Sequence, residues 1–337
     1  MKPYPVNTLP PNITRWAGAG SVHHVRYVHE RQGSAPGPDV LLTALVHGNE
    51  YSGAIVLSEL LASGWLPSCG RVTVAFCNVA AFEQFDAQQP DASRFVDEDL
   101  NRVWSLQRLD STAHSTELDR ARQLRPLVDR ATHLLDLHSM HEAGAPLLVT
   151  GTLQRNIDFA QALQTTSQVV VDAGHADGVR MRDYGAFGEA DSEGNGGGYS
   201  DGDSERIALL LEAGQHWDLR SVKVARNTVM RFLVQAGAMA QGVVPSGWLL
   251  PDTAPPAPLV VTDRVVATSM DFRFAPPFDT ATGGETIARA GTVIALDAGQ
   301  KVVTPYDNCT LVMPSVRQLR PGVTTVRLGR RSNLKLL

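Results

Sequence analysis

The chain has 337 residues, 43% of them hydrophobic, which is enough for one large core or for a core plus a smaller domain. The formal net charge of −5 provides no basic field, so we do not expect nucleic acid as a partner. Three scattered cysteines, Cys69, Cys77 and Cys309, argue against a disulfide framework and a paired-cysteine zinc site, and they fit reduced thiols in a cytosol.

The N-terminal segment, residues 1–11, holds four prolines and lacks the apolar stretch of a signal peptide. No later apolar run is long enough to span a membrane. From these features we expect a cytoplasmic protein with no membrane partner.

The hydrophobic pattern then predicts strands that alternate with helices. The expected strands cover residues 22–29, 40–47, 71–79, 132–138, 168–172 and 207–211. The expected helices cover residues 52–65, 116–131, 156–165 and 219–238. This alternation predicts an α/β layer sandwich.

Two stretches of unusual composition interrupt this pattern. Residues 194–203 are rich in Gly, Ser and Asp, but no helix follows them as a phosphate-binding loop would require, so we expect a mobile flap or a plain surface loop. Residues 245–258 hold five prolines and few charges, and we place a domain boundary there. The first domain is then 1–245, the linker 246–258, and the short β-rich runs of 259–337 form a small all-β domain.

Three expected strands lead into residues that can bind a metal or carry a proton. His47, His138 and Glu212 stand at these strand ends, and Glu50 follows His47 where a helix begins. The carboxyl ends of neighbouring parallel strands meet at one crevice, so these four side chains are expected to lie together. His47, Glu50 and His138 form a His₂Glu set, a standard three-ligand arrangement for catalytic zinc that leaves a fourth position for water.

Structural interpretations of the same residues remain open. Asn49 could cap the helix, with Glu50 in its first turn, and His138 could simply bond to backbone. Asp136 lies two residues before His138 and points to the same face of a strand. Its carboxylate could orient a ligand imidazole, or it could make only a local hydrogen bond.

A second unusual stretch, residues 94–102, follows a strand and has no regular period. It contains Arg94, Asn101 and Arg102, and arginine side chains bind carboxylates through two parallel hydrogen bonds. The alternative is a solvated charge cluster, in which the acidic residues at 97–99 neutralise both arginines locally.

The combined pattern resembles the aspartoacylase / succinylglutamate desuccinylase family, zinc amidohydrolases with a carboxypeptidase A-like fold. The matching motifs are His47-Gly48-Asn49-Glu50, Asp99-Leu100-Asn101-Arg102 and Asp136-Leu137-His138. Glu212, before Ala213 and Gly214, matches the family's catalytic glutamate, and Arg94 matches its catalytic arginine. The resemblance spans about residues 20–240. It implies a carboxypeptidase-like α/β/α sandwich with a mixed sheet, plus a small C-terminal all-β domain.

The resemblance also implies a role for individual residues. The implied ligands of one zinc ion per chain are His47, Glu50 and His138. Glu212 would be the general base, and Arg94 would polarise the scissile carbonyl. Asn101 and Arg102 would hold a substrate carboxylate, and Tyr306 is a loose match to a tyrosine over the site.

One position departs from the family pattern. Gly202 stands where aspartoacylase has a further substrate-binding arginine, and Arg180, Arg182 or Arg206 could replace it.

We expect a zinc-dependent amidohydrolase that cleaves an N-acyl amino acid or a similar small carboxylate-bearing amide. The alternatives are a metallocarboxypeptidase acting on peptides and a non-catalytic zinc- or ligand-binding protein. The acyl group, the amine and the oligomeric state, a homo-oligomer included, stay open.

Overall fold

The fold is built around one large sheet with helices on both faces. The computed structural model describes residues 4–18, 24–175, 177–189, 205–254 and 257–332. The strands before the C-terminal region are β1 (Val28–Gln32), β2 (Asp39–Ala44), β3 (Arg71–Phe76), β4 (His133–Met140), β5 (Leu147–Val149), β6 (Gln168–Val171) and β7 (Ile207–Gln215). The C-terminal strands are β8 (Leu259–Val266), β9 (Arg273–Phe274), β10 (Thr286–Ile287), β11 (Val293–Asp297), β12 (Gln300–Val303), β13 (Cys309–Val312) and β14 (Thr324–Arg331). The α-helices are α1 (Ser52–Ala62), α2 (Val79–Phe82), α3 (Leu106–Leu109), α4 (Thr116–Arg130), α5 (Gln154–Leu163) and α6 (Leu219–Gln235).

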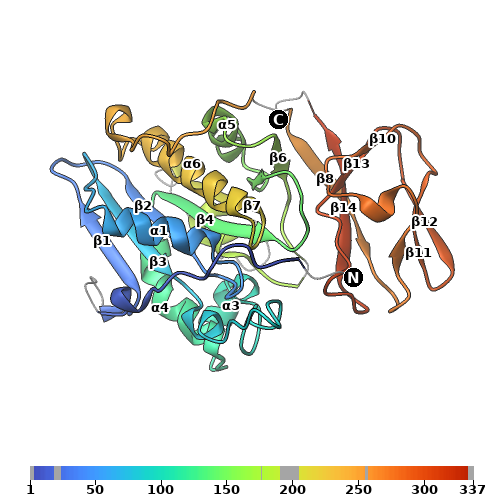
Figure 1. The fold of residues 1–337 in the computed structure, drawn as a ribbon, viewed down its shortest axis with the longest axis horizontal. Coiled ribbons are helices and arrows are strands. Elements are labelled where there is room, and N and C mark those ends of the chain that lie inside the picture. Colours follow the sequence, from blue (N-terminus) through green and yellow to red (C-terminus); the bar gives the residue numbers. More distant parts are fainter. Residues whose placement is uncertain (1–3, 19–23, 176, 190–204, 255–256, 333–337) are drawn as a thin grey trace.

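Within the described residues, eleven strands join in the order β1-β3-β2-β4-β7-β5-β6-β8-β14-β13-β10 (Figure 1). The central strands β3, β2, β4 and β7 are parallel, whereas β1 and β5 pair antiparallel with their neighbours β3 and β7. A separate antiparallel sheet has the order β12-β11-β9. The predicted fold class, a mixed-sheet α/β protein with a small additional β region, is confirmed.

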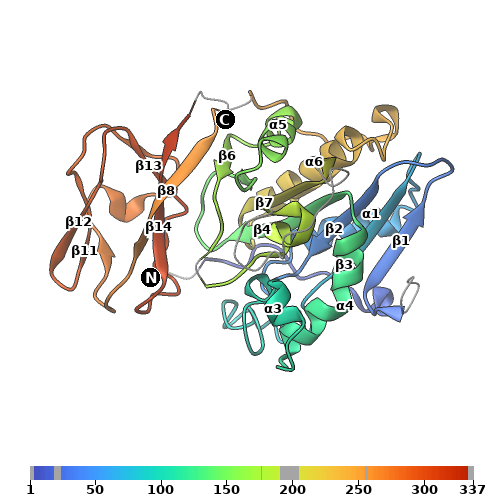
Figure 2. The same cartoon turned by 180° about the vertical axis from the view of Figure 1, so that it is seen from behind.

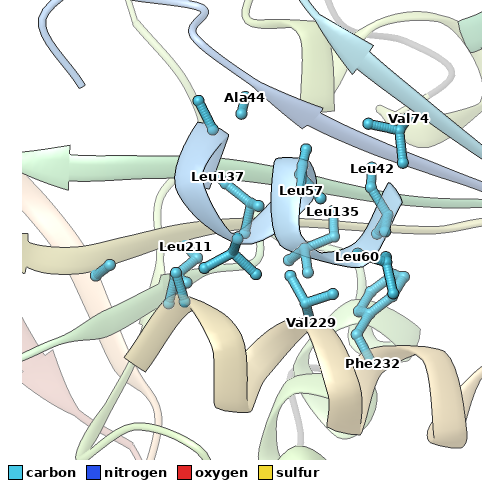
Figure 3. Close-up of a cluster of buried hydrophobic side chains, with 14 of the residues drawn as sticks. Leu42, Ala44, Leu57, Leu60, Val74, Leu135, Leu137, Leu211, Val229 and Phe232 are labelled. Carbon is cyan, nitrogen blue, oxygen red and sulfur yellow. The ribbon is translucent and has the colours of Figure 1, made fainter. Parts of the chain in front are cut away.

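Both faces of the central parallel strands are buried, as their almost continuous apolar sequences predict. Leu42 and Leu135 point to the face on which α1 and α6 pack (Figure 3). Leu41 and Leu134, one residue earlier on each strand, point to the opposite face, on which α4 packs. Figures 1 and 2 show the two helical layers from opposite sides. The carboxyl ends of β2, β4 and β7 therefore meet at one edge of a layered core.

Most of the predicted helices and strands are present with ends shifted by a few residues. The expected strand at 22–29 is wrong in its extent, because β1 begins only at Val28. His24 and Tyr27 have φ angles of 57° and 63°, a left-handed conformation that is incompatible with a strand. The short strand β5 was not predicted. The glycine-rich stretch at 194–203 lies outside the described residues.

The C-terminal strands extend the main sheet, because β8 lies parallel beside β6 and β14 pairs antiparallel with β8. This region also has a hydrophobic core of its own, which includes Phe272, Ile294, Leu311 and Val326. The division of the chain into two domains at residues 246–258 stays a prediction.

Cys69, Cys77 and Cys309 are all free, and the last two are buried. Among the described residues, no helix is both long enough and apolar enough to cross a membrane.

Candidate active site

The loop between β2 and α1 carries the first two candidate metal ligands. His47 and Glu50 both lie in this loop and are almost fully buried. The helix begins at Ser52 and its N-cap is Tyr51, which makes no side-chain capping bond. The alternative interpretation of Asn49 as the helix cap is therefore wrong, and His47 and Glu50 are presented by irregular backbone at the strand end.

Gly48 is required in this loop by a close contact. Its N–H donates to the carbonyl oxygen of Arg94 at 3.0 Å. A Cβ atom at Gly48 would lie 2.4 Å from the Ser93 carbonyl oxygen and 2.5 Å from the Ala81 carbonyl carbon. The left-handed residue of this turn is Leu45, with a φ of 60°. The glycine thus allows the segment at 93–94 to pack directly against the loop.

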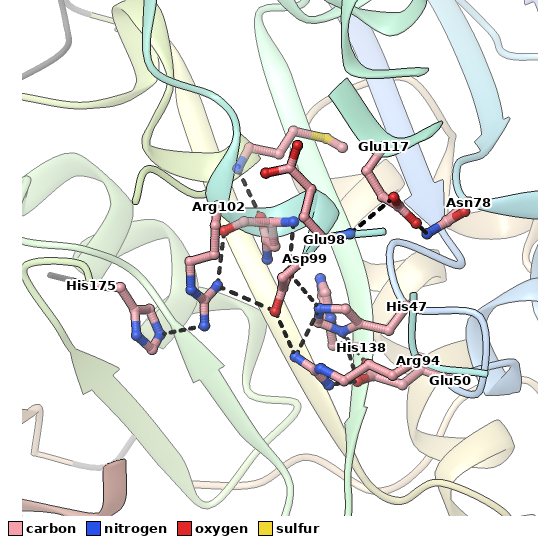
Figure 4. A network of polar contacts seen from close by, with 12 residues as sticks. His47, Glu50, Asn78, Arg94, Glu98, Asp99, Arg102, Glu117, His138 and His175 are labelled. Carbon is pink, nitrogen blue, oxygen red and sulfur yellow. Dashed lines mark hydrogen bonds and ion pairs between the residues drawn. The ribbon is translucent and has the colours of Figure 1, made fainter. Parts of the chain in front are cut away.

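His47, Glu50 and His138 form a compact cluster whose ligand atoms all lie within 4.8 Å of one another (Figure 4). Nδ1 of His47 lies 2.7 Å from Oε1 of Glu50, and Nδ1 of His138 lies 3.0 Å from Oε2 of Glu50. His138 lies on β4, directly opposite Glu212 on the parallel neighbour β7. The strand-end arrangement that the sequence predicted does bring these side chains together.

The second nitrogen of each imidazole faces another carboxylate. Nε2 of His47 lies 3.0 Å from Asp99 and 2.8 Å from Nη2 of Arg94, and Nε2 of His138 lies 2.7 Å from Asp136. Asp136 is itself fixed by a hydrogen bond of 2.7 Å from the Thr43 hydroxyl. Histidine ligands of a metal usually donate their other N–H to a carboxylate in this way. The donor set, two imidazoles and one carboxylate with carboxylates behind both rings, fits one divalent metal ion.

Charge pairing dominates the electrostatics of this cluster. Burial alone would raise the pKa of Glu50, but His47 and His138 outweigh it and hold this pKa well below the usual range. Burial alone would lower the pKa of His138, but Asp136 and Glu50 outweigh it and hold this pKa well above the usual range.

Glu212 differs from Glu50 and Asp136 because, among the described residues, it has no close cationic partner. Burial and then the charge of Glu50 raise the pKa of Glu212 to about 8. Its Oε2 atom is buried and has no hydrogen-bond partner among the described residues. A buried carboxylate oxygen without a partner suits a group that receives a water proton or faces a bound cation.

Arg94 connects the cluster to the stretch at 94–102. Its Nη1 donates to Glu50 at 3.1 Å, and its Nη2 donates to Asp99 at 3.1 Å. Burial would lower the pKa of Arg94, but Asp99 and Glu50 raise it above its usual value. The guanidinium therefore stays charged beside the cluster, as Figure 4 shows.

The loop that carries Arg94 and Asp99 is held by a residue that we did not single out from the sequence. Glu117, fully buried in the first turn of α4, accepts hydrogen bonds of 2.7, 3.0 and 3.2 Å from the backbone N–H groups of residues 96–98. It also accepts one of 2.8 Å from Asn78 (Figure 4). An acidic residue in the first turn of a helix is usually explained by its interaction with the helix dipole. The sequence therefore did not indicate that Glu117 contacts this loop.

We expect Glu117→Gln to lower the free energy of unfolding by about 1–3 kcal/mol, because an amide cannot accept from all of these buried donors. The loop that carries Arg94 and Asp99 should also become more mobile, and kcat should fall as a result. Thermal unfolding and kcat measured on the same variant would test this. Asp119→Asn is a matched control in the same turn, since Asp119 is half exposed, and it should change neither quantity appreciably. Equal effects of the two substitutions would contradict the proposed loop contact.

Asn101 and Arg102 lie in the short 3₁₀ helix at Leu100–Arg102. The Asn101 side chain accepts a hydrogen bond of 2.8 Å from the Met181 backbone N–H, so part of its function is structural. Arg102 Nη2 lies 3.4 Å from Nε2 of His175. Burial, which Asp99 opposes and nearby arginines reinforce, lowers the pKa of Arg102 to about 10.

Two further arginines, Arg180 and Arg327, share the cavity wall with Arg102. Both pair with buried Asp172, at 3.4 and 3.1 Å. Arg327 comes from β14 and was not among the predicted site residues. Because Arg327 lies far from Arg102 in the sequence, no local sequence pattern could place the two arginines in one site.

The other candidates for the missing arginine lie elsewhere. Arg182 is buried and donates to the Thr150 carbonyl oxygen at 2.7 Å. Arg206 donates to the Asp129 carbonyl oxygen at 2.7 Å. Neither lines the main cavity, so Arg180 is the one of the three expected replacements that does.

Tyr306 is not brought to the other candidate residues. Its hydroxyl forms a hydrogen bond with Thr262, and the guanidinium carbon of Arg330 lies 3.8 Å from its ring centre. The ring packs against the C-terminal hydrophobic core and does not line the main cavity.

The cavity at the carboxyl ends of the central strands has a volume of about 810 Å³. Its wall contains the candidate metal cluster, Glu212, Arg94, Asn101 and Arg102. Residues of the C-terminal region, among them Arg317 and Arg327, complete the wall. One cavity therefore presents the candidate ligand atoms, a carboxylate without a close partner among the described residues, and several guanidinium groups.

Comparisons with solved structures show similar folds at low sequence identity. Succinylglutamate desuccinylase/aspartoacylase from Rhodobacter sphaeroides has a TM-score of 0.63 at 18% identity, over 92% of this chain and 90% of that one. The Vibrio parahaemolyticus succinylglutamate desuccinylase has 0.60 at 17%, over 90% and 86%. The product-bound ectoine utilization protein EutE (DoeB) from Ruegeria pomeroyi has 0.60 at 19%, over 90% and 89%.

The comparison with protein families addresses the catalytic region itself. No curated protein matches the chain. Residues 36–192 match the sequence model described as "Succinylglutamate desuccinylase/Aspartoacylase catalytic domain". The resemblance expected from the sequence is confirmed: residues 36–192 match the catalytic-domain model of a family of amide hydrolases, and the similar solved structures include members of that family.

Proposed function

We propose that this protein is a zinc-dependent deacylase that hydrolyses the amide bond of a small N-acyl amino acid. The observation that carries this proposal is the His47–Glu50–His138 cluster, which shares one cavity with Glu212 and Arg94. A single zinc ion on the cluster would supply Lewis acidity and a water whose pKa is lowered to about 7.

Glu212 is the proposed proton carrier. It would accept a proton from the attacking water and return it to the leaving nitrogen, a contribution of roughly 10²- to 10⁴-fold. A divalent cation beside Glu212 would lower its raised pKa again, because the cation favours the ionised carboxylate. The unpaired Oε2 atom supports this role.

Arg94 and Arg102 are the proposed oxygen-binding groups. Arg94 lies against Glu50 and would donate to the oxygen of the scissile carbonyl as negative charge develops there. Arg102, with Arg180 and Arg327 on the same wall, would bind the carboxylate of the amino acid. Because the C-terminal region completes the wall, the cavity suits a small substrate better than a long peptide.

The test is metal analysis combined with a hydrolysis screen of the purified chain. We expect about one zinc per chain and release of free amine from at least one N-acyl amino acid. Short peptides serve as the comparison set. Cleavage of peptides alone would support a carboxypeptidase instead, and stoichiometric zinc without any hydrolysis would support a binding protein.

We expect Arg102→Ala to raise KM by more than it lowers kcat. A carboxylate clamp contacts the substrate equally in the ground state and in the transition state, so its loss weakens binding mainly. Steady-state kinetics on the best substrate would measure both constants. An unchanged KM with a collapsed kcat would make Arg102 part of the reaction chemistry instead.

A further inference from the structure

Two histidines outside the metal cluster, His141 and His216, are connected to it by polar contacts. His141 follows β4 and His216 follows β7, the same two strands that carry His138 and Glu212. The backbone N–H of His216 donates to the Met140 carbonyl oxygen at 3.0 Å. The ring centres of His141 and His216 lie 4.7 Å apart, with the rings edge to face. The same strand pair thus positions a second pair of polar side chains.

A chain of polar contacts links these rings to the cluster. The Ser139 backbone N–H donates to Glu50 at 3.1 Å, and the Ser139 hydroxyl lies 2.8 Å from Nδ1 of His216. Nε2 of His216 lies 3.2 Å from Nδ1 of His141. His141 and Ser139 line the main cavity, whereas His216 lies behind them and is buried.

The buried serine hydroxyl determines where the ring protons lie. Among the described residues its one partner is Nδ1 of His216, and this pairing fits a serine O–H that donates to an unprotonated Nδ1. Burial and the facing His141 hold the pKa of His216 well below its usual range, so this ring is neutral and carries its single proton on Nε2.

The tautomer of His141 follows from that of His216. With the His216 proton on Nε2, this N–H faces Nδ1 of His141 as an acceptor, and the arrangement is completed by an N–H at Nε2 of His141. Oδ1 of Asp91, a buried oxygen with no hydrogen bond among the described residues, lies 3.4 Å from the same Nδ1, at the long end of hydrogen-bond distances. No polar partner contacts Nε2 of His141 in the part of the chain that the structure describes, so this N–H is available to a ligand in the cavity.

Two separate series of contacts lead from the metal cluster, one to Arg102 and one to His141. Arg102 reaches the cluster through Asp99, and His141 reaches it through His216 and Ser139. With the amino-acid carboxylate at Arg102 and the amide at the cluster, an acyl chain that follows the second series of contacts would point toward His141. Asp91, Glu142 and Arg317 surround this part of the wall, with two negative charges and one positive charge, so it suits a neutral acceptor better than a carboxylate.

We propose that His141 donates a hydrogen bond from Nε2–H to a neutral oxygen in the acyl chain of the substrate, and that His216 is the residue that positions the His141 ring. This proposal rests on the proposed deacylase function. The substrates favoured by this contact are N-acyl amino acids whose acyl chain carries a carbonyl or hydroxyl oxygen beyond the scissile carbonyl.

The test compares two pairs of probes on the same amino acid, N-(4-oxopentanoyl) with N-pentanoyl and N-(5-oxohexanoyl) with N-hexanoyl. The measured quantity is the ratio of kcat/KM for the oxo probe to that for its alkyl partner. In at least one pair, we expect the wild type to favour the oxo probe by about tenfold, the scale of one good hydrogen bond.

Two substitutions distinguish the two ring nitrogens. A Gln side chain places an amide N–H near the position of Nε2, so His141→Gln should keep most of the preference. An Asn side chain reaches only to the position of Nδ1, so His141→Asn should reduce the ratio to about one. His114→Asn, at a side chain that is 76% exposed, is the control and should keep the wild-type ratio. Melting temperatures would show that each variant is folded.

A purely structural role of His141 through Nδ1 predicts the opposite order, with Asn tolerated and Gln not, and that order would overturn the proposal. So would a wild-type ratio of about one in both pairs, with hydrolysis of the probes intact; the deacylase function would then still stand. If the wild type hydrolyses no N-acyl amino acid at all, the deacylase function fails and this proposal fails with it.

Discussion

Glu212→Gln should reduce kcat by about 10²-fold or more while the protein keeps its fold and its zinc. Glutamine has nearly the same shape as glutamate, but its amide cannot take a proton from water. Glu212 follows the buried run 207–211 on β7 and lies opposite His138, so its backbone position is fixed by the core. Its Oε2 atom has no hydrogen bond among the described residues to lose. The substitution should therefore cost little stability.

Three measurements on this variant separate the possible roles of Glu212. They are kcat, zinc content and melting temperature. Glu59→Gln is the matched control, because Glu59 pairs with Arg226 on the helical face, away from the cavity, and its loss should leave turnover within about twofold. Turnover close to wild type with zinc retained would reject Glu212 as the proton carrier. Loss of zinc would make it a ligand.

The parts of the site that the sequence predicted share one property: they stand at the ends of strongly apolar runs. The runs before His47, His138 and Glu212 could form only buried strands, and buried parallel strands direct their carboxyl ends to one edge. The structure brings these residues together for that reason. Their roles as metal ligands and as base stay predictions.

The residues that the sequence did not reveal reach the site through contacts across large separations in the chain. Glu117 holds the backbone of residues 96–98 from a neighbouring helix, and Arg327 reaches the cavity from β14. The hydrogen bond that joins Ser139 on β4 to His216, the residue after β7, likewise connects distant segments. Local periodicity carries no information about such pairings. Tyr306 illustrates the converse, because a loose motif match in the C-terminal region did not bring the side chain to the cavity.

We expect His138→Ala to abolish both zinc binding and hydrolysis. The substitution removes one of the three ligand groups and leaves Asp136 as a buried carboxylate without its imidazole partner, so some loss of stability should accompany it. Two remaining ligands do not make a tetrahedral zinc site. Metal analysis after dialysis and the hydrolysis assay would measure the two losses. Full zinc occupancy in this variant would remove His138 from the ligand set.

A graded series makes this prediction sharper. Asp136→Asn keeps all three ligand groups and changes only the carboxylate behind His138, so it should weaken zinc binding by about 10- to 100-fold without abolishing it. His133→Ala, on the same strand β4, is the control: its ring packs against Phe159 and Phe232, and its loss should leave the zinc in place. Competition with a chelator would rank the affinities, with wild type and His133→Ala highest, Asp136→Asn lower and His138→Ala lowest.

If Asp136→Asn bound zinc as tightly as the wild type, the contact between Asp136 and His138 would be structural alone. If His133→Ala also lost its zinc, the loss in His138→Ala would reflect damage to β4 in general rather than the removal of a ligand.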